Sequence, residues 1–508
     1  MAKETRIMGK RAAGILMPIS SLPSDYGIGC FSKSAYEFVD WLKEAGQTYW
    51  QILPLGPTSY GDSPYQSFST FAGNPYFIDL DTLVEEGVLD KKDCEKVNWG
   101  KKPDEVDYEK IYKGRYPLLR KAYENSDISK NPDYQKFVAE NSWWLSDYAL
   151  FMAVKDRFEG VEWTKWAEDI RLRWNNAMDY YRAALYFDIE FQQYMQFKFY
   201  EQWMKLKSYA NSKGIQIIGD IPIYVAMDSA DAWAHPELFQ LDQDNVPLAV
   251  AGCPPDGFSA TGQLWGNPLY RWDYHRNTGY QWWISRMSYC FRLYDVVRID
   301  HFRGFDEYFS IPYGDKDARG GHWEKGPGID LFRKIEQALG WKQVIAEDLG
   351  YMTDSVRHLV YESGFPGMKV LEFAFDSRDS GCASDYLPHN YPENCVAYTG
   401  THDNETIVGW WKSITAAERK LARDYLCDHA TPEEELYKCF ISLIMRSAAR
   451  VCVIPMQDYM GLDNRSRMNQ PSTVGTNWKW RIKKRDLTKK LQKEIYDVTL
   501  RYGRKNWD

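Results

Sequence analysis

Three acidic residues stand at or just beyond the ends of short apolar runs of the 508-residue chain. Asp300 ends the run VVRID, Glu347 follows VIA, and Asp403 lies in YTGTHDN. An acidic residue after a strand often does no more than cap the next helix, so each one alone is more often structural than catalytic. Three of them, each flanked by polar or aromatic residues, favour a site built on carboxylates.

Paired carboxylates suit glycosidic chemistry. One ionised carboxylate attacks the anomeric carbon, and a second, kept protonated by its surroundings, protonates the leaving oxygen. Arg298 precedes Asp300 by two residues, so both side chains point to one face of a strand, where the guanidinium would hold Asp300 ionised. A purely structural ion pair would have the same spacing. Asp348 points to the opposite face from Glu347, which favours a structural role.

The composition narrows the function classes. Aromatic residues make up 16% of the chain, with 21 Trp, and sugar-binding clefts use such flat rings with polar edges. A formal net charge of -8 argues against general binding to nucleic acid or an anionic membrane. The nine Cys form no CxxC pair or Cys/His cluster, so we expect neither a metal site nor disulfides, but reduced thiols in a cytoplasmic protein.

The N-terminal region could be mistaken for a secretion signal. Lys10 and Arg11 precede a short apolar run, but Pro18 breaks the run and no convincing cleavage site follows. We interpret the run as a first buried strand. No stretch approaches the roughly 18 apolar residues that a membrane span needs.

Short apolar runs alternate with stretches of helical periodicity, which is typical of a parallel sheet with crossover helices. Eight such strands predict an α/β fold, a (β/α)₈ TIM barrel, with the three carboxylates on the rim at the carboxyl ends of the strands. The predicted strands are 14–19, 48–54, 215–225, 295–302, 343–348, 368–374, 395–402 and 451–457. The predicted helices include 33–46, 188–213, 280–294, 329–340, 353–363 and 437–450.

A plain barrel needs about 250 residues, so about half of this chain must be insertions. Residues 81–185, rich in charges, Trp and Tyr, predict a helical insertion subdomain. Residues 226–278, rich in Pro, Gly and Asp, predict a loop-rich insertion over the cleft. We expect residues 1–508 to form a single decorated catalytic domain without a separate C-terminal domain.

Six ordered segments between about residue 14 and residue 481 resemble the 4-α-glucanotransferase family, also called amylomaltases or disproportionating enzymes. This is glycoside hydrolase family 77, within the α-amylase clan of retaining enzymes. Its members have a (β/α)₈ catalytic barrel with inserted subdomains. The matching segments are SPYQSFSTFAGNPYFIDL (63–80), GDIPIYVAMDSADAW (219–233), GCPPDGFSATGQLWGNPLYRW (252–272), VVRIDHFRGF (296–305), AEDLG (346–350) and YTGTHDNET (398–406).

The resemblance implies roles for individual residues. Asp300 would be the nucleophile that forms a covalent glucosyl intermediate, Glu347 the general acid and then base, and Asp403 a ligand of the donor-sugar hydroxyls. The implied substrate-binding residues are Tyr60 at an outlying glucan groove, Tyr65 under the sugar at the cleavage point, Asp220, Arg298 and His402 at that subsite, and Gln263 and Trp265 on a loop over the cleft. Read without the resemblance, the aromatic residues could be packing residues, Asp220 a cap and His402 a strand-end histidine.

The chain departs from the family pattern in places. Ser472 and Thr476 stand where glycines are expected, which puts the local loop geometry in question, and Glu405 replaces an Asp. The implied function is transfer of an α-1,4-glucan segment from a maltooligosaccharide to the 4-hydroxyl of another glucan, with no cofactor. The alternatives are an α-glucan hydrolase that uses water, and a non-catalytic glucan-binding protein. The sequence says nothing about oligomeric state.

Overall fold

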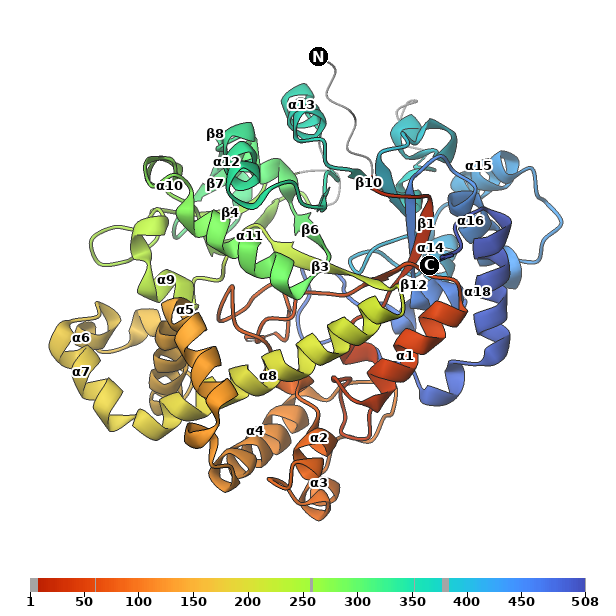
Figure 1. Cartoon of the computed structure of the whole chain (residues 1–508). Coiled ribbons are helices and arrows are strands. Elements are labelled where there is room, and N and C mark those ends of the chain that lie inside the picture. Colours follow the sequence, from red (N-terminus) through yellow and green to blue (C-terminus); the bar gives the residue numbers. More distant parts are fainter. Residues whose placement is uncertain (1–7, 60, 256–258, 351, 377–382, 508) are drawn as a thin grey trace.

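Eight parallel strands form one sheet in the computed structural model, in the order β10-β11-β12-β1-β2-β3-β6-β9. The structure describes residues 8–507 except 60, 256–258, 351 and 377–382 (Figure 1). The strands are β1 (Ala12–Leu16), β2 (Tyr49–Gln51), β3 (Gln216–Pro222), β6 (Val296–Asp300), β9 (Val344–Ala346), β10 (Gly367–Val370), β11 (Cys395–Tyr398) and β12 (Val451–Pro455).

All eight predicted strands are confirmed, and most are shorter than the apolar runs that predicted them. The first strand begins at Ala12 and ends at Leu16, rather than spanning 14–19. Pro18 explains the early end, because proline has no N–H for the ladder and restricts the residue before it.

Alternate residues of the eight strands fill the inside of the barrel. Side chains in a strand point to opposite faces with a period of two, so every second residue faces inward. The resulting apolar cluster contains buried residues from every strand: Ala12, Leu16, Tyr49, Ile218, Val296, Ile345, Met368, Val370, Val396, Tyr398, Val451 and Val453. The inside of the barrel is therefore a packed core that ends below the rim.

Strands β9 and β10 stand at the two ends of the strand order and close the barrel. Ala346 N–H donates to the Pro366 carbonyl at 2.9 Å. The next amide, of Met368, donates at 2.7 Å to Oδ1 of Asp348. This carboxylate takes the place of a strand carbonyl, so Asp348 has a structural contact on the opposite face from Glu347.

The predicted helices that precede or follow the strands are confirmed to within a few residues. They form the outer layer around the sheet, with the long helix α8 running beside α1 (Figure 1). Their bounds are α1 (Lys33–Glu44), α8 (Tyr186–Ser212), α11 (Gln281–Leu293), α12 (Ile329–Leu339), α13 (Asp354–Ser363) and α16 (Leu436–Met445).

Residues 81–185 are helical. They form the lower part of the view in Figure 1, where α5 packs along α8. Lys155 on α5 donates at 2.6 Å to Asp228 in the segment after β3, and Trp163 donates at 2.6 Å to the Met227 carbonyl. These contacts fix the helices to the barrel. The helices are α2 (Leu80–Glu85), α3 (Lys91–Lys96), α4 (Tyr108–Asn125), α5 (Pro132–Arg157), α6 (Glu168–Arg171) and α7 (Asn175–Ala184).

Residues 226–278 contain two strands that the sequence analysis did not predict. Strands β4 (Ala249–Cys253) and β5 (Gln263–Pro268) join β7 (Glu307–Pro312) and β8 (His322–Lys325) in an antiparallel sheet of order β5-β4-β7-β8. Helices α9 (Ala230–Ala234) and α10 (Trp272–Asn277) flank the first two strands. Pro and Gly in runs such as QLWGNP mask the strand pattern, because both residues are unusual in strands.

The last part of the chain packs back onto the barrel. The side-chain amide of Gln492 in α18 donates to the Trp41 carbonyl in α1 at 3.1 Å. Helix α18 packs against α1 and α16 of the barrel's outer layer (Figure 1). Within residues 8–507, apart from the gaps given above, no helix is long and apolar enough to cross a membrane. The remaining helices are α14 (Ile407–Ser413), α15 (Ala416–Leu426), α17 (Met456–Tyr459) and α18 (Lys489–Arg501).

Candidate active site

Four polar residues continue the inward-facing rows of strands β3, β6 and β9. Asp220 follows inward Ile218, Arg298 and Asp300 follow Val296, and Glu347 follows Ile345, each at a spacing of two. The register of β3 and β6 places Asp220 opposite Arg298. The sheet that packs the apolar core therefore brings these side chains together at its carboxyl rim.

Arg298 joins two carboxylates. Its Nη1 atom donates to both oxygens of Asp220, at 2.8 and 2.7 Å, and lies 3.0 Å from Oδ1 of Asp300. The Arg298 side chain is 3% exposed, so both contacts form away from bulk water, where charged hydrogen bonds are strong. The ion pair indicated by the sequence spacing is present, and Asp220 shares it.

The Asp300 side chain is largely buried but can still be reached from the cleft. Burial raises its pKa to about 6 against the lowering effect of the Arg298 charge. The carboxyl side chain is still 28% exposed. At neutral pH the group is therefore mostly ionised and reachable from the cleft.

Glu347 lies beside Asp300 and is held by two backbone amides. The N–H of His301 donates to Oε2 at 2.7 Å, and the N–H of Leu349 donates to Oε1 at 2.9 Å. Burial and then the Asp300 charge raise the pKa of Glu347 to about 7, against the lowering effects of Arg298 and the two amides. Glu347 is thus the better proton carrier of the two carboxyls near neutral pH.

The loop after β11 supplies His402 and Asp403. Nε2 of His402 lies 3.2 Å from Oδ2 of Asp403, and Asn469 donates from Nδ2 to Oδ1 at 2.6 Å. Burial would raise the pKa of Asp403, but His402 and Asn469 together lower it to about 2. Burial lowers the pKa of His402, but the charge of Asp403 and its hydrogen bond raise it above its ordinary value. Asp403 therefore stays ionised, and its side chain is 43% exposed.

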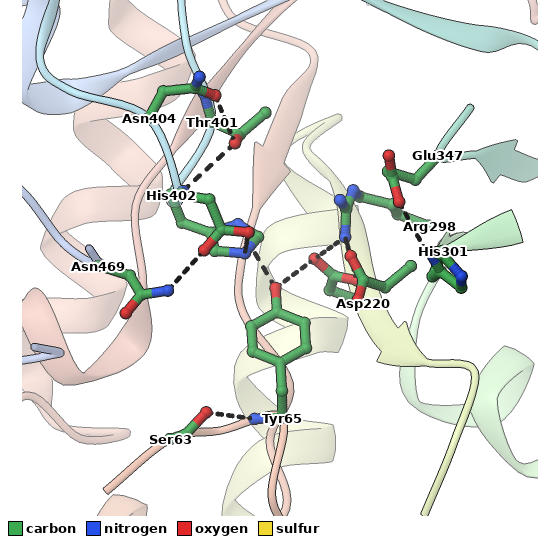
Figure 2. Close-up of polar contacts among 12 residues, drawn as sticks. Ser63, Tyr65, Asp220, Arg298, His301, Glu347, Thr401, His402, Asn404 and Asn469 are labelled. Carbon is green, nitrogen blue, oxygen red and sulfur yellow. Dashed lines mark hydrogen bonds and ion pairs between the residues drawn. The ribbon is translucent and has the colours of Figure 1, made fainter. Parts of the chain in front are cut away.

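Tyr65 connects the two halves of the site. Its hydroxyl donates to Oδ2 of Asp220 at 2.8 Å and lies 3.4 Å from Nδ1 of His402. The Tyr65 and His402 rings stack with centroids 5.0 Å apart. Figure 2 shows the hydroxyl between the Asp220–Arg298 pair and His402, with Glu347 and His301 at one end of the cluster and Asn469 at the other.

Gln263 and Trp265 approach the site from β5. Nε1 of Trp265 donates to the Gln263 side chain at 3.0 Å, and the Trp265 ring meets the His301 ring edge-on at 4.8 Å. Trp265 therefore stands next to the residue that binds Glu347. Tyr60 lies outside the described residues, so its predicted place in an outlying groove stays a prediction.

Sequence reasoning missed three residues that contact the predicted ones. His301 adopts a left-handed backbone conformation (φ 53°) that is rare for a residue with a side chain, and its N–H binds Glu347. Arg467 donates to the Asp403 carbonyl at 2.7 Å, and Asn469 binds the Asp403 carboxylate. His301 stands in the matching segment VVRIDHFRGF (296–305), and Arg467 and Asn469 stand in RMNQPSTVGTNWKWR (467–481), the stretch that contains Ser472 and Thr476. Both segments pointed to the region and not to its contacts.

The described residues of the site offer no set of metal ligands. In the part of the chain that the structure describes, no group of three or more His, Cys, Asp or Glu side chains could hold a metal ion. The chemistry available to these residues is proton transfer, carboxylate attack and hydrogen bonding to a neutral polar ligand.

A family model described as 4-alpha-glucanotransferase matches residues 17–488. The chain belongs to this family. A 4-alpha-glucanotransferase of Clostridium butyricum is 49% identical over 490 residues, which are 96% of this chain and all of the relative. One of Thermus thermophilus is 46% identical over 481 residues, which are 93% of this chain and 95% of the relative.

The solved structures agree with the family assignment. An amylomaltase from Streptococcus agalactiae, solved in complex with acarbose, superposes with a TM-score of 0.94. It is 44% identical, and the match covers 98% of this chain and all of that one. The (β/α)₈ barrel of this chain is therefore the fold of a solved 4-alpha-glucanotransferase family member.

Proposed function

We propose that this 4-alpha-glucanotransferase family enzyme moves an α-1,4-glucan segment from a maltooligosaccharide to the 4-hydroxyl of another glucan or of glucose. The observation that carries the proposal is the group formed by Asp300, Glu347 and Asp403 on one barrel rim. Two of these carboxyls differ in pKa in the order that a nucleophile and an acid require, at about 6 and about 7. The named relatives support transfer over other uses of the site.

In the first half of the proposed reaction, the Asp300 carboxylate attacks the anomeric carbon of the donor. The bond from that carbon to the 4-oxygen of the leaving glucan breaks, and Glu347 gives its proton to the departing oxygen. Charge develops on the sugar ring as this bond breaks. The ionised Asp403 carboxylate, open to the cleft beside His402, binds the donor hydroxyls and favours that state.

In the second half, the ionised Glu347 takes the proton from the 4-hydroxyl of the acceptor. The freed oxygen attacks the anomeric carbon and breaks the ester, which returns Asp300 as a carboxylate. Two inversions leave the α configuration unchanged. Arg298 steadies Asp300 in both halves, because its Nη1 atom binds Asp300 and Asp220 together.

The wall against which the sugar at the cleavage point rests would be formed by Tyr65, Asp220, Arg298 and His402. Gln263 and Trp265 would reach over the cleft from β5. The proposed substrates are maltooligosaccharides and α-1,4-glucans, and no step needs a cofactor. A cytoplasmic location stays a prediction.

The products from maltotriose test the proposal. Transfer yields glucose together with maltopentaose and, in later rounds, further chains longer than maltotriose, whereas a hydrolase yields shorter sugars alone and a binding protein yields no new sugar. Asp300→Asn should lower turnover by at least about 10³-fold without unfolding the chain. Asp348→Asn is the matched control, since it makes the same change on the outer face beside Glu347 and should retain activity. Absence of the longer chains would overturn transfer.

A further inference from the structure

Asn469 touches two consecutive residues of the site. Its side-chain amide donates to Oδ1 of Asp403 at 2.6 Å, and its backbone N–H donates to the His402 carbonyl at 3.0 Å. Since His402 lies against Oδ2, both oxygens of the Asp403 carboxylate have a partner. The carboxylate is therefore fixed in rotation as well as in charge.

Asn469 is itself held in place from both sides. Arg467 donates from Nε to the Asn469 carbonyl at 2.8 Å and from Nη2 to the Asp403 carbonyl at 2.7 Å. The backbone N–H of Trp478 donates to the Met468 carbonyl at 2.7 Å and closes the loop that follows. The position of the Asn469 amide thus depends on a closed segment and not on a free side chain.

The segment 468–478 is also built around a second asparagine. Oδ1 of Asn477 accepts the N–H of Gln470 at 3.0 Å, and its Nδ2 donates to the Thr473 carbonyl at 2.9 Å. The Trp478 ring at the end of the loop lies 5.9 Å from Tyr65 and 6.1 Å from His402, centroid to centroid. The loop therefore packs against Tyr65 and His402, two residues of the site.

We infer that Asn469 is a positioning residue for Asp403, supplying the neutral donor that keeps its carboxylate oriented toward the donor sugar. This inference rests on the proposed function, because it matters to the reaction only if Asp403 acts on the donor. A neutral amide stabilises the ionised carboxylate without adding a competing charge to the cleft. An alanine would leave Oδ1 without this donor and let the carboxylate turn.

Two substitutions separate positioning from structure. Asn469→Ala should lower kcat for maltotriose disproportionation by about 10- to 100-fold with a smaller change in KM, because the lost contact stabilises the transition state. Asn469→Asp keeps the shape but sets a second carboxylate against Asp403. Two such groups share a proton at lower pH, so the loss for Asn469→Asp should grow as the pH rises from 5 to 8.

Asn211→Asp is the matched control. Asn211 lies near the end of α8, away from the cleft, and donates to Oδ2 of Asp295 at 2.8 Å, so its substitution also puts an aspartate against an aspartate. It should leave kcat and its pH dependence unchanged. Thermal denaturation of all variants checks that the chain is folded. Activity of both Asn469 variants within twofold of the parent enzyme, or a loss that does not vary with pH for Asn469→Asp, would overturn the inference.

Acarbose binding separates this inference from the proposed function. Asn469→Ala should weaken acarbose binding in the parent enzyme and have no further effect in an Asp403→Asn background, since the partner carboxylate is gone. If Asp403→Asn retains full activity, the proposed role of Asp403 is wrong. If Asp403→Asn is inactive while Asn469→Ala changes neither turnover nor acarbose binding, Asn469 has no positioning role.

Discussion

Asp300 and Glu347 are both buried carboxyl groups with different charged and polar neighbours. Burial raises the pKa of both, but Asp300 has the Arg298 guanidinium at 3.0 Å while Glu347 has two neutral amides and the Asp300 charge. A cation favours the ionised form more than an amide does, and a neighbouring anion disfavours it. These contacts preserve the order that the ordinary pKa values of the two residue types already have, with Asp below Glu.

The pH dependence of kcat/KM should reflect this order. Activity needs Asp300 ionised, which is lost as the pH falls below about 6, and Glu347 protonated, which is lost as the pH rises above about 7. We therefore expect a bell-shaped profile with its maximum between these values, measured from initial rates with maltotriose.

A second donor, 4-nitrophenyl α-maltoside, tests the role of Glu347. Its leaving group needs little protonation, so the fall in the rate of bond cleavage at alkaline pH should become smaller. An alkaline limb that is the same for both donors would contradict the assignment of Glu347 as the acid.

Of the two residues that stand where the family has glycine, Ser472 is the one with an unfavourable backbone conformation. Its φ is 65°, in the left-handed region where a side chain is unfavourable, whereas Thr476 keeps an ordinary negative φ. Ser472→Gly should stabilise the chain by up to about 1 kcal/mol, because the strain that glycine relieves in the folded loop exceeds the freedom that it adds to the unfolded chain. The midpoint of thermal denaturation measures this effect.

The matched control for that substitution is Thr476→Gly, four residues along in the same exposed loop. It should destabilise the chain by about 0.5–1 kcal/mol, because it adds freedom to the unfolded chain and relieves no strain. Equal shifts in denaturation midpoint for the two variants would show that the backbone conformation of Ser472 is not the reason for the difference.

At the scale of elements, strands β9 and β10 meet through a side chain as well as through the backbone. Asp348 accepts the Met368 N–H at 2.7 Å, and a Cβ at Gly367 would lie 2.3 Å from its Oδ2 atom. Gly367 thus leaves room for the carboxylate. The residue before Asp348 is Glu347, so this junction also supports the strand end that carries the proposed acid.

Asp348→Ala should therefore affect both stability and turnover. Without the carboxylate, the Met368 N–H loses its partner at a cost of about 1–3 kcal/mol. We expect a lower denaturation midpoint and a reduced kcat, because Glu347 lies on the loosened strand. Asp348→Asn keeps an acceptor oxygen and should lie close to the parent enzyme in both measurements. A normal kcat in the alanine variant would show that the junction does not support Glu347.

The elements that sequence could predict are those whose pattern is local. Apolar runs of strand length and helices of period 3.6 were found within a few residues, because each element repeats its own signal. Strands β4 and β5 were missed, since Gly266 and Pro268 weaken the pattern of β5, and the second partner of β4 is β7, about sixty residues further along the chain. The Asp348 junction was also beyond prediction, because nothing local to β9 indicates that a side chain replaces a strand carbonyl.

The same limit applied to the site. Carboxylates on inward rows of β6 and β9 follow from spacing once a barrel is assumed, but the position of Asn469 depends on a loop that returns from beyond β12. The net rise in the pKa of Asp300 was not anticipated either. The sequence showed the neighbouring Arg298, but burial, which outweighs it, is a property of the folded cleft.

At the scale of the whole molecule, some of the many aromatic residues pack the helices around the barrel and others lie at the cleft. Trp163, Trp203 and Trp233 are fully buried, in the inserted helices, in α8 and in α9. Trp265 and Tyr65 lie at the site. Most of the aromatic content thus packs the helices around the barrel, and the sugar chemistry indicated by composition concerns a small part of it.

The shared guanidinium has a consequence for what can enter the cleft. The carboxylates of Asp220, Asp300 and Asp403 are contacted by only two cationic side chains, Arg298 and His402, so we expect a negative potential in the cleft near neutral pH. A neutral sugar chain crosses such a field freely, while a phosphorylated or sulfated one is repelled. The charge that serves bond cleavage therefore also selects unmodified chains, and this selection should weaken as salt screens the field.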